Sequence, residues 1–141
     1  MTSEEFIRRA VGLPWVDRAC SWSAMDCWGV VMMYFRYVYD EELPLVEGYS
    51  SGEKPIASGF SEQVASGKWE KVDSAAGDCI VFTAYKDGVP CHVGVVVNGA
   101  YVLHSAGNAA HDGHVRCDRL DAFKRFHRDI EFYRYTGCRC L

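Results

Sequence analysis

The feature that most constrains the fold is the stretch from Asp26 to Tyr39, which is apolar on nearly every side when wound as a helix. Such a helix cannot lie on a surface, because its outer side would expose apolar side chains to water. The sequence therefore predicts a central, buried helix about 21 Å long. Asp40 and, a few residues later, Pro44 mark its end.

The start of this helix carries a chemical signal. Asp26 can cap the helix, and Cys27 follows it directly. A helix N-terminus bears partial positive charge, which favours thiolate over thiol. Because a thiolate is a strong nucleophile near neutral pH, Cys27 is a candidate nucleophile. The alternative is an inert packing residue, which is the commoner role of a lone cysteine at a helix start.

Other local signals complete the first half of the chain. Thr2 and Glu5 have the spacing of a capping box, which predicts a short helix ending near Val11. Gly29 weakens the first turn of the central helix by about 1 kcal/mol relative to alanine. A close packing neighbour would explain this glycine. Residues 43–76 are expected to be loop, with one short helix over 61–65.

The second half of the chain is rich in β-branched and aromatic residues and predicts a sheet. A short helical turn is expected around residues 120–126. The 141 residues fit one domain, 1–141, of α+β class. Its central helix would pack on an antiparallel β-sheet of about five strands. The predicted strands cover residues 79–85, 92–97, 100–104, 113–117 and 131–135.

The hairpin around residues 98 and 99 decides whether two histidines share a face. A two-residue turn would put His92 and His104 on opposite faces, because strand side chains alternate. A three-residue connection with a glycine bulge pairs Val96 with Ala100 and sets the two histidines directly opposite each other. Their Cβ atoms would then lie about 5 Å apart. Hydrolytic chemistry requires the second arrangement or a compensating bulge near Gly94, and we predict that the two histidines share a face through the second arrangement.

Together these residues indicate a Cys-His-His hydrolase. His92 would take the proton of Cys27 and later protonate the leaving amine. His104 would orient His92, and the backbone N–H of Cys27 would help to bind the oxyanion. The alternative is that each histidine is a hydrogen-bonded core residue, the usual role of histidine on an apolar strand.

Composition excludes several other classes of function. A net charge of −4 argues against nucleic-acid binding. No apolar stretch reaches membrane-spanning length, and the start of the chain lacks a secretion signal, so we expect synthesis in the cytoplasm without a signal peptide and no membrane insertion. Seven cysteines are expected to be reduced.

We expect neither a metal nor a cofactor. His111, His114 and Cys117 could approach one ion, but a fourth ligand at suitable spacing is missing. The segment with Asn108 and Asp112 is expected to form the rim of a cleft, and His127 is expected to lie on the surface. The remaining candidates, Cys79, Cys91 and Cys117, are expected to fill core or surface positions.

Five short stretches resemble the NlpC-type cell-wall peptidases in their order and spacing. They are Pro14-Trp15, Asp26–Val31, Gly77–Phe82, His92–Val95 and Leu103–Ser105. The resemblance covers residues 12 to 106 and implies a papain-like fold without a cofactor. It implies cleavage of peptide bonds in peptidoglycan stem peptides, with Cys27 as nucleophile, His92 as base and His104 as the third polar residue.

Further roles follow from this resemblance. Trp15 stands where many members have a tyrosine near the nucleophile; its single N–H donor could copy part of that role, and a packing role is equally open. Asp26 corresponds to an acidic residue that contacts a substrate amine in some members. Asp17 and Arg18 stand where paired glycines are usual.

The sequence Asp-Cys-Trp-Gly, with Glu42-Leu43-Pro44 downstream, resembles the bacteriophage tail-associated branch of the family. This likeness implies other phage tail proteins as partners and delivery to the wall by the virion. Two alternatives stay open. The domain could be a catalytically idle structural or binding component of a phage tail, or an acyltransferase on the same fold.

Overall fold

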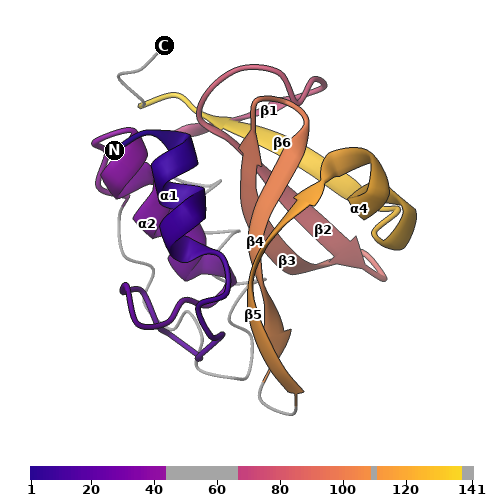
Figure 1. Ribbon diagram of the computed structural model, residues 1–141. Helices are drawn as coiled ribbons and strands as arrows, with labels where there is room; N and C mark the ends of the chain where they lie inside the picture. Colours follow the sequence, from indigo (N-terminus) through magenta and orange to yellow (C-terminus); the bar gives the residue numbers. More distant parts are fainter. Residues whose placement is uncertain (44–66, 109–110, 138–141) are drawn as a thin grey trace.

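The computed structural model describes residues 1–43, 67–108 and 111–137 of the chain. Within them, three helices flank a six-stranded antiparallel sheet of strand order β1-β6-β2-β3-β4-β5 (Figure 1). The helices are α1 (Ser3–Ala10), α2 (Cys27–Val38) and α4 (Leu120–Phe126). The strands are β1 (Trp69–Val72), β2 (Ile80–Lys86), β3 (Val89–Val97), β4 (Tyr101–Asn108), β5 (His111–Arg119) and β6 (Ile130–Tyr135). This architecture confirms the α+β class, with one strand more than expected.

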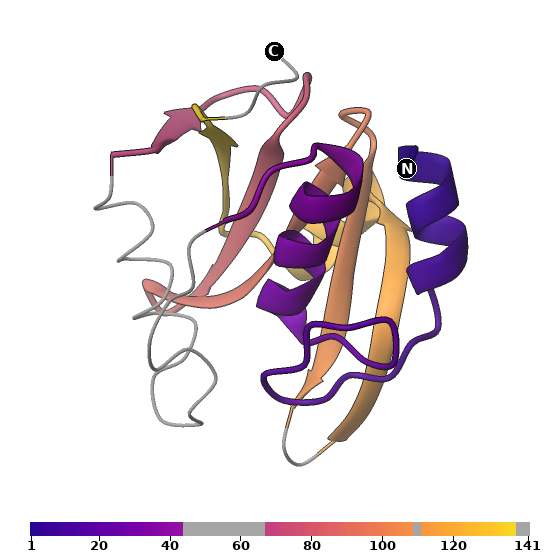
Figure 2. The same ribbon diagram turned by 90° about the vertical axis from the view of Figure 1, so that its left-hand side faces the viewer.

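Helix α2 is the predicted central helix. Its side chains are buried from Cys27 to Phe35 without a break. It packs on β3 and β4, and Figure 2 shows it lying over the middle of the sheet with α1 beside it. Gly29 has the close neighbour that its presence implied, because a Cβ atom there would lie 2.1 Å from the carbonyl oxygen of Ala19.

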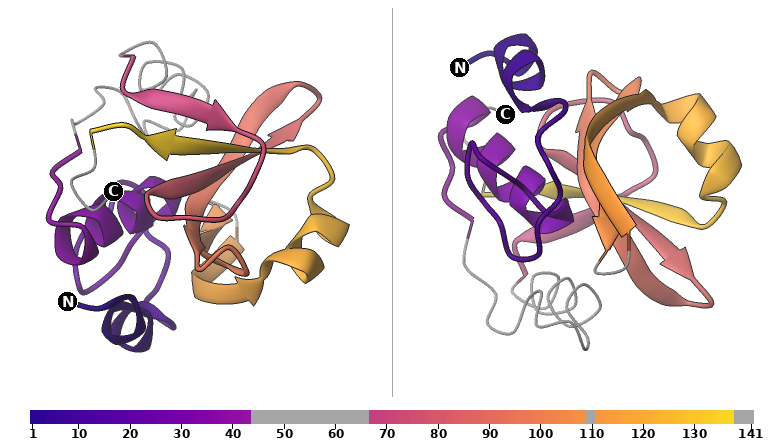
Figure 3. Two further views of the ribbon diagram at one scale, coloured as in Figure 1. Left: turned by 90° about the horizontal axis from the view of Figure 1, so that it is seen from above. Right: turned by 60° about the horizontal axis from the view of Figure 1, so that its bottom comes forward.

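The sheet has two covered faces. Helices α1 and α2 lie on one side, here called the α2 face, and α4 lies on the other, the α4 face (Figure 3). Each face has its own apolar cluster, as the alternation of strand side chains requires. The strands contribute Val81, Val93, Val95, Leu103 and Val115 to the α2 face. They contribute Ile80, Phe82, Val96, Val102 and Phe132 to the α4 face, where α4 adds Leu120 and Phe123.

The β3–β4 hairpin differs in register from the prediction. Val97 pairs with Tyr101 and Val95 with Leu103, so that residues 98–100 form the connection. The predicted pairing of Val96 with Ala100 is therefore wrong by two residues on β4. A shift of two residues preserves the side-chain faces, so His92 and His104 do share one face. Among the described residues, the ladder between these strands runs only from Val95–Leu103 to Val97–Tyr101.

Strand β1 lies in the segment that was expected to be loop. It has four residues and pairs with β6 at the edge of the sheet. Its two central residues, Glu70 and Lys71, are exposed. Too few apolar residues alternate here to indicate a strand from sequence. The helix expected over 61–65 lies outside the described residues.

The segment just after α1 runs alongside β5 and covers its outer edge. The N–H of Gly12 donates to the carbonyl of Val115 (2.9 Å), whose own N–H donates to the carbonyl of Leu13 (2.8 Å). The N–H of Trp15 donates to the carbonyl of Gly113 (2.9 Å). This pairing fixes the position of Trp15 over the end of the sheet.

Two further predictions concern the start of α1 and the state of the cysteines. The capping box of Thr2 and Glu5 is present, with both reciprocal hydrogen bonds at 3.1 Å. The expectation that all thiols are reduced is wrong, because Cys79 is disulfide-bonded. The described cysteines outside a disulfide are Cys20, Cys27, Cys91 and Cys117. None of the helices in the described residues has the length and apolarity needed to cross a membrane.

Candidate active site

Asp26 builds the start of α2, as its position predicted. Its carboxylate accepts a hydrogen bond from the N–H of Gly29 (2.7 Å) and another from the N–H of Arg18 (2.9 Å). The first bond is an N-cap. The second holds a turn in which Arg18 has a φ of 65°, a conformation that favours glycine. The residue is only 2% exposed, so in this structure its carboxylate serves the backbone and is not open to a substrate amine.

Cys27 occupies the first position of α2 and is buried, at 5% exposure. It belongs to the apolar cluster of the α2 face, which also contains Val93 and Leu103. The neighbouring backbone is tied to the sheet, because the hydroxyl of Ser105 donates to the carbonyl of Met25 (2.6 Å). The thiol is therefore held at the capped helix start that the sequence indicated.

The two predicted histidines meet in a hydrogen-bonded row. Nε2 of His92 lies 2.9 Å from Nδ1 of His104, and Nε2 of His104 lies 2.8 Å from Oδ2 of Asp118. The guanidinium of Arg116 donates to the other oxygen of Asp118 at 3.2 Å. Sequence reasoning paired the histidines but missed Asp118. Alternation along β5 indicates that Asp118 lies on the face opposite Val115 and Cys117, but only the pairing of β5 with β4 brings it beside His104.

Aromatic rings surround this row on the α4 face. The ring centroid of Phe82 lies 5.7 Å from that of His92, and the centroid of Phe123 lies 5.1 Å from that of His104. His127 stacks on Phe123 (4.2 Å) and lies 6.1 Å from His92. His127, expected at the surface, is partly exposed, and its ring packs against the row through Phe123.

Burial controls the charge of these groups. Burial and, to a lesser extent, the neighbouring rings of His104 and His127 lower the pKa of His92 to about 3. Burial also lowers the pKa of His104, although the Asp118 carboxylate opposes that effect. Burial alone would raise the pKa of Asp118, but hydrogen bonds from His104 and Arg116 bring it below its ordinary value. At neutral pH the row consists of two neutral imidazoles and one carboxylate.

The structure brings the two imidazoles together but packs Cys27 on the other face of the sheet. His92 and His104 contact Phe82 and Phe123 on the α4 face, whereas the thiol belongs to the α2 face. The predicted convergence of sulfur and both rings at one cleft therefore stays a prediction, as does proton transfer between Cys27 and His92.

Trp15 is positioned for packing. A Cβ atom on Gly107 would lie 2.8 Å from the Trp15 side chain, so the two residues are in close contact. This contact lies on the α2 face near Ser105, two residues earlier on β4. The rim residues expected nearby are only partly described, since the side chains of Asn108, His111 and Asp112 lie outside the description. His114 is exposed.

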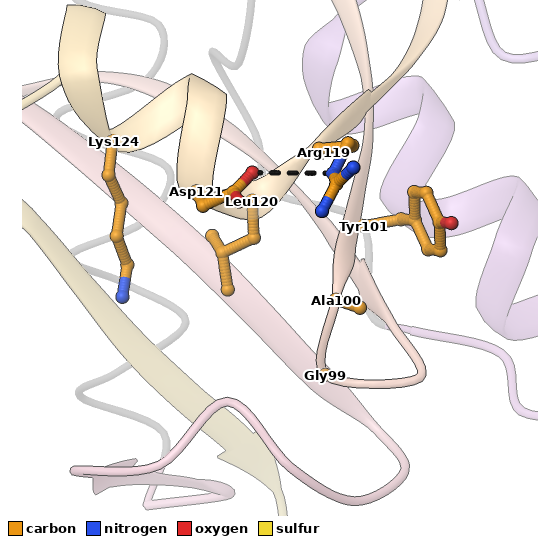
Figure 4. A pocket seen from close by; sticks show the side chains of 7 residues that line it. All are labelled: Gly99, Ala100, Tyr101, Arg119, Leu120, Asp121 and Lys124. Atoms are coloured by element: carbon orange, nitrogen blue, oxygen red, sulfur yellow. Dashed lines mark ion pairs between the residues drawn. The ribbon is translucent and has the colours of Figure 1, made fainter.

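A cavity of about 290 Å³ lies at the β3–β4 turn and the start of α4 (Figure 4). An ion pair of 3.5 Å between Arg119 and Asp121 crosses it, and Lys124 stands at its edge. It includes none of the predicted catalytic residues. Within the described part of the chain, no group of three or more His, Cys, Asp or Glu side chains is arranged to hold a metal ion.

Helix, sheet and capped cysteine define an α+β protein of papain-like type. The sequence profile of the NlpC/P60 family matches residues 13–125, so the chain belongs to this family. Among solved structures, the NlpC/p60 domain of the peptidoglycan hydrolase SagA is similar in fold, with a TM-score of 0.54 and 19% sequence identity. The match covers 88% of this chain and 87% of that domain. No curated protein sequence is significantly similar to this chain.

Proposed function

We propose that this domain is a cysteine peptidase of the bacterial cell wall that cleaves peptide bonds in peptidoglycan stem peptides. The observation that carries the proposal is the His92–His104–Asp118 row in an NlpC/P60 chain whose Cys27 begins a capped, buried helix. The similar fold of a peptidoglycan hydrolase domain supports the choice of substrate. Neither a metal nor a cofactor has a part in the proposed reaction.

In the proposed reaction the thiol of Cys27 gives its proton to His92 as the sulfur attacks the scissile carbonyl carbon. The C–N bond then breaks, His92 returns the proton to the leaving amine, and a thioester remains on Cys27. Water, deprotonated by His92, hydrolyses the thioester to a carboxylic acid and restores the thiol. The low pKa of His92 favours a neutral imidazole at rest, which can accept the proton of the thiol during the attack.

The thiol of Cys27 and the imidazole of His92 must come into contact for this proton transfer. The β3–β4 ladder ends at Val95 and Leu103, so the strand segments that carry His92 and His104 lie beyond it. In the proposal the proton passes between the faces at this point, where the two strands are not paired. The proposal requires Cys27 and His92 to come within hydrogen-bond distance when substrate binds.

A second candidate function follows from the same geometry. The packing of the thiol and the imidazoles on different faces favours a domain that binds wall peptides without cleaving them. Such a domain would suit a structural component of a phage tail, with other tail proteins as partners and the virion as its location. The two functions differ in turnover, which is measurable.

Mass spectrometry of defined muropeptides incubated with the purified chain tests the proposal. We expect the native protein to release stem-peptide fragments and Cys27→Ala to lose at least about 10³-fold in kcat. Cys91→Ala is the matched control, since Cys91 is another free thiol, exposed and next to His92. Binding of muropeptides without any release by the native protein would favour the idle domain.

A further inference from the structure

Asp118 stands at the far end of the hydrogen-bonded row, where it can act on His92 only through His104. The carboxylate lies 2.8 Å from Nε2 of His104, and the guanidinium of Arg116 holds its other oxygen at 3.2 Å. Its side chain is 28% exposed, whereas that of His104 is 5% exposed. The row therefore runs from solvent inward and has one ionised end.

The protons along this row can be counted. A carboxylate only accepts hydrogen bonds, so the bond to Asp118 places a proton on Nε2 of His104. Neutral His104 then has no proton on Nδ1, which must accept from His92. His92 therefore carries its proton on Nε2, and its Nδ1 keeps a lone pair. That lone pair is what a general base needs.

Without the carboxylate of Asp118, the protons on the two histidines could take the opposite arrangement. Neutral His104 could then carry its proton on Nδ1 and donate it to Nε2 of His92. In that state His92 carries its own proton on Nδ1, the nitrogen that a thiol would have to reach. The 2.9 Å distance between the rings is compatible with either direction, so the carboxylate makes the choice.

We infer that Asp118 is a positioning residue that selects the base-competent tautomer of both histidines, with each proton on Nε2. Arg116 supports it by fixing the plane of the carboxylate and its charge. The catalytic use of this tautomer rests on the proposed function, but the tautomer itself does not. The row thus has four members, of which only the two histidines belong to the residues predicted from sequence.

Nitrogen-15 NMR of the full chain at neutral pH tests the inference, because two-bond proton–nitrogen couplings identify the protonated ring nitrogen. In the native protein we expect His92 and His104 both to carry the proton on Nε2. In Asp118→Ala we expect a mixture of tautomers at both rings. Asp121→Ala is the matched control, since it removes an exposed carboxylate outside the row and should leave both tautomers unchanged.

Native spectra with the proton on Nδ1 of His92 would overturn the inference, even if Asp118→Ala does not fold. Unchanged tautomers in a folded Asp118→Ala would overturn it as well. Where the native protein hydrolyses muropeptides, we expect Asp118→Ala to lower kcat by about 10²-fold with little change in KM. If the native protein shows the expected tautomers without hydrolysis, the proposed function fails while the role of Asp118 stands.

Discussion

The two faces of the sheet satisfy the same need for apolar cover in different ways. On the α2 face, aromatic and aliphatic side chains fill the space, and the polar Ser105 is fully buried with a backbone partner. On the α4 face, the rings of Phe82 and Phe123 enclose a row of ionisable groups. Buried ionisable groups are tolerated only when each has a partner. The first face therefore holds the fold together, and the second holds its charge-sensitive groups.

Removal of a large side chain from each face should give the largest effects and separate the two roles. Phe35→Ala, at a fully buried position on α2, should lower the free energy of unfolding by about 3–5 kcal/mol and leave the histidine ring signals in place. Phe123→Ala should also destabilise the protein, but it should shift the signals of His92 and His104, which its ring contacts. Urea denaturation and NMR measure both. Equal shifts in the two variants would show that the faces are not independent.

Acidification should weaken the α4 face through His92. Because the pKa of His92 is about 3 in the folded chain and near 6.5 when unfolded, the unfolded chain binds more protons between these values. The free energy of unfolding should therefore fall as the pH decreases from about 6.5 toward 3, by on the order of a few kcal/mol. His92→Gln should flatten this slope in denaturation curves. The exposed His114→Gln is its control, and an equal flattening there would contradict the assignment.

The cap of α2 offers a smaller test on the other face. Asp26→Ala removes hydrogen bonds to two backbone N–H groups and should destabilise the protein by about 1–2 kcal/mol. Asp26→Asn retains an acceptor and should lose less. Thermal denaturation measures both. If the alanine variant is as stable as the native protein, the cap does not hold the start of α2.

The smallest expected effect concerns the turn that Asp26 holds. Arg18 has a φ of 65°, so Arg18→Gly removes the strain of a left-handed side chain and should stabilise the protein by about 0.5 kcal/mol. Arg18→Ala keeps the strain and is the control. A glycine variant no more stable than the alanine variant would mean that the left-handed backbone at this position costs no stability.

Local patterns predicted much of this molecule. The cap at Asp26, the burial of α2 and the capping box at Thr2 depend on neighbours within a few residues, so the sequence contains them. The hairpin register was wrong because the connection takes in Ala100 in addition to the two residues with positive φ, Asn98 and Gly99. Alternation still put His92 and His104 on one face.

What the sequence could not decide is which face α2 covers. Val93 and Val95 alternate on β3 with His92 and Val96, so both faces offered an apolar surface to a helix. That choice depends on packing between segments far apart in the chain. The same is true of Asp118, whose place beside His104 depends on how β5 pairs with β4.

The segment after α1 that runs along β5 has a consequence for self-association. An uncovered outer strand presents a row of backbone donors and acceptors to which a second molecule can add a strand. Here Gly12, Leu13 and Trp15 already occupy that position along the middle of β5. At the opposite border, short β1 carries exposed Glu70 and Lys71, which discourage a neighbour. Truncation of the chain before Trp15 would therefore do more than remove a helix, because it would leave β5 open to aggregation.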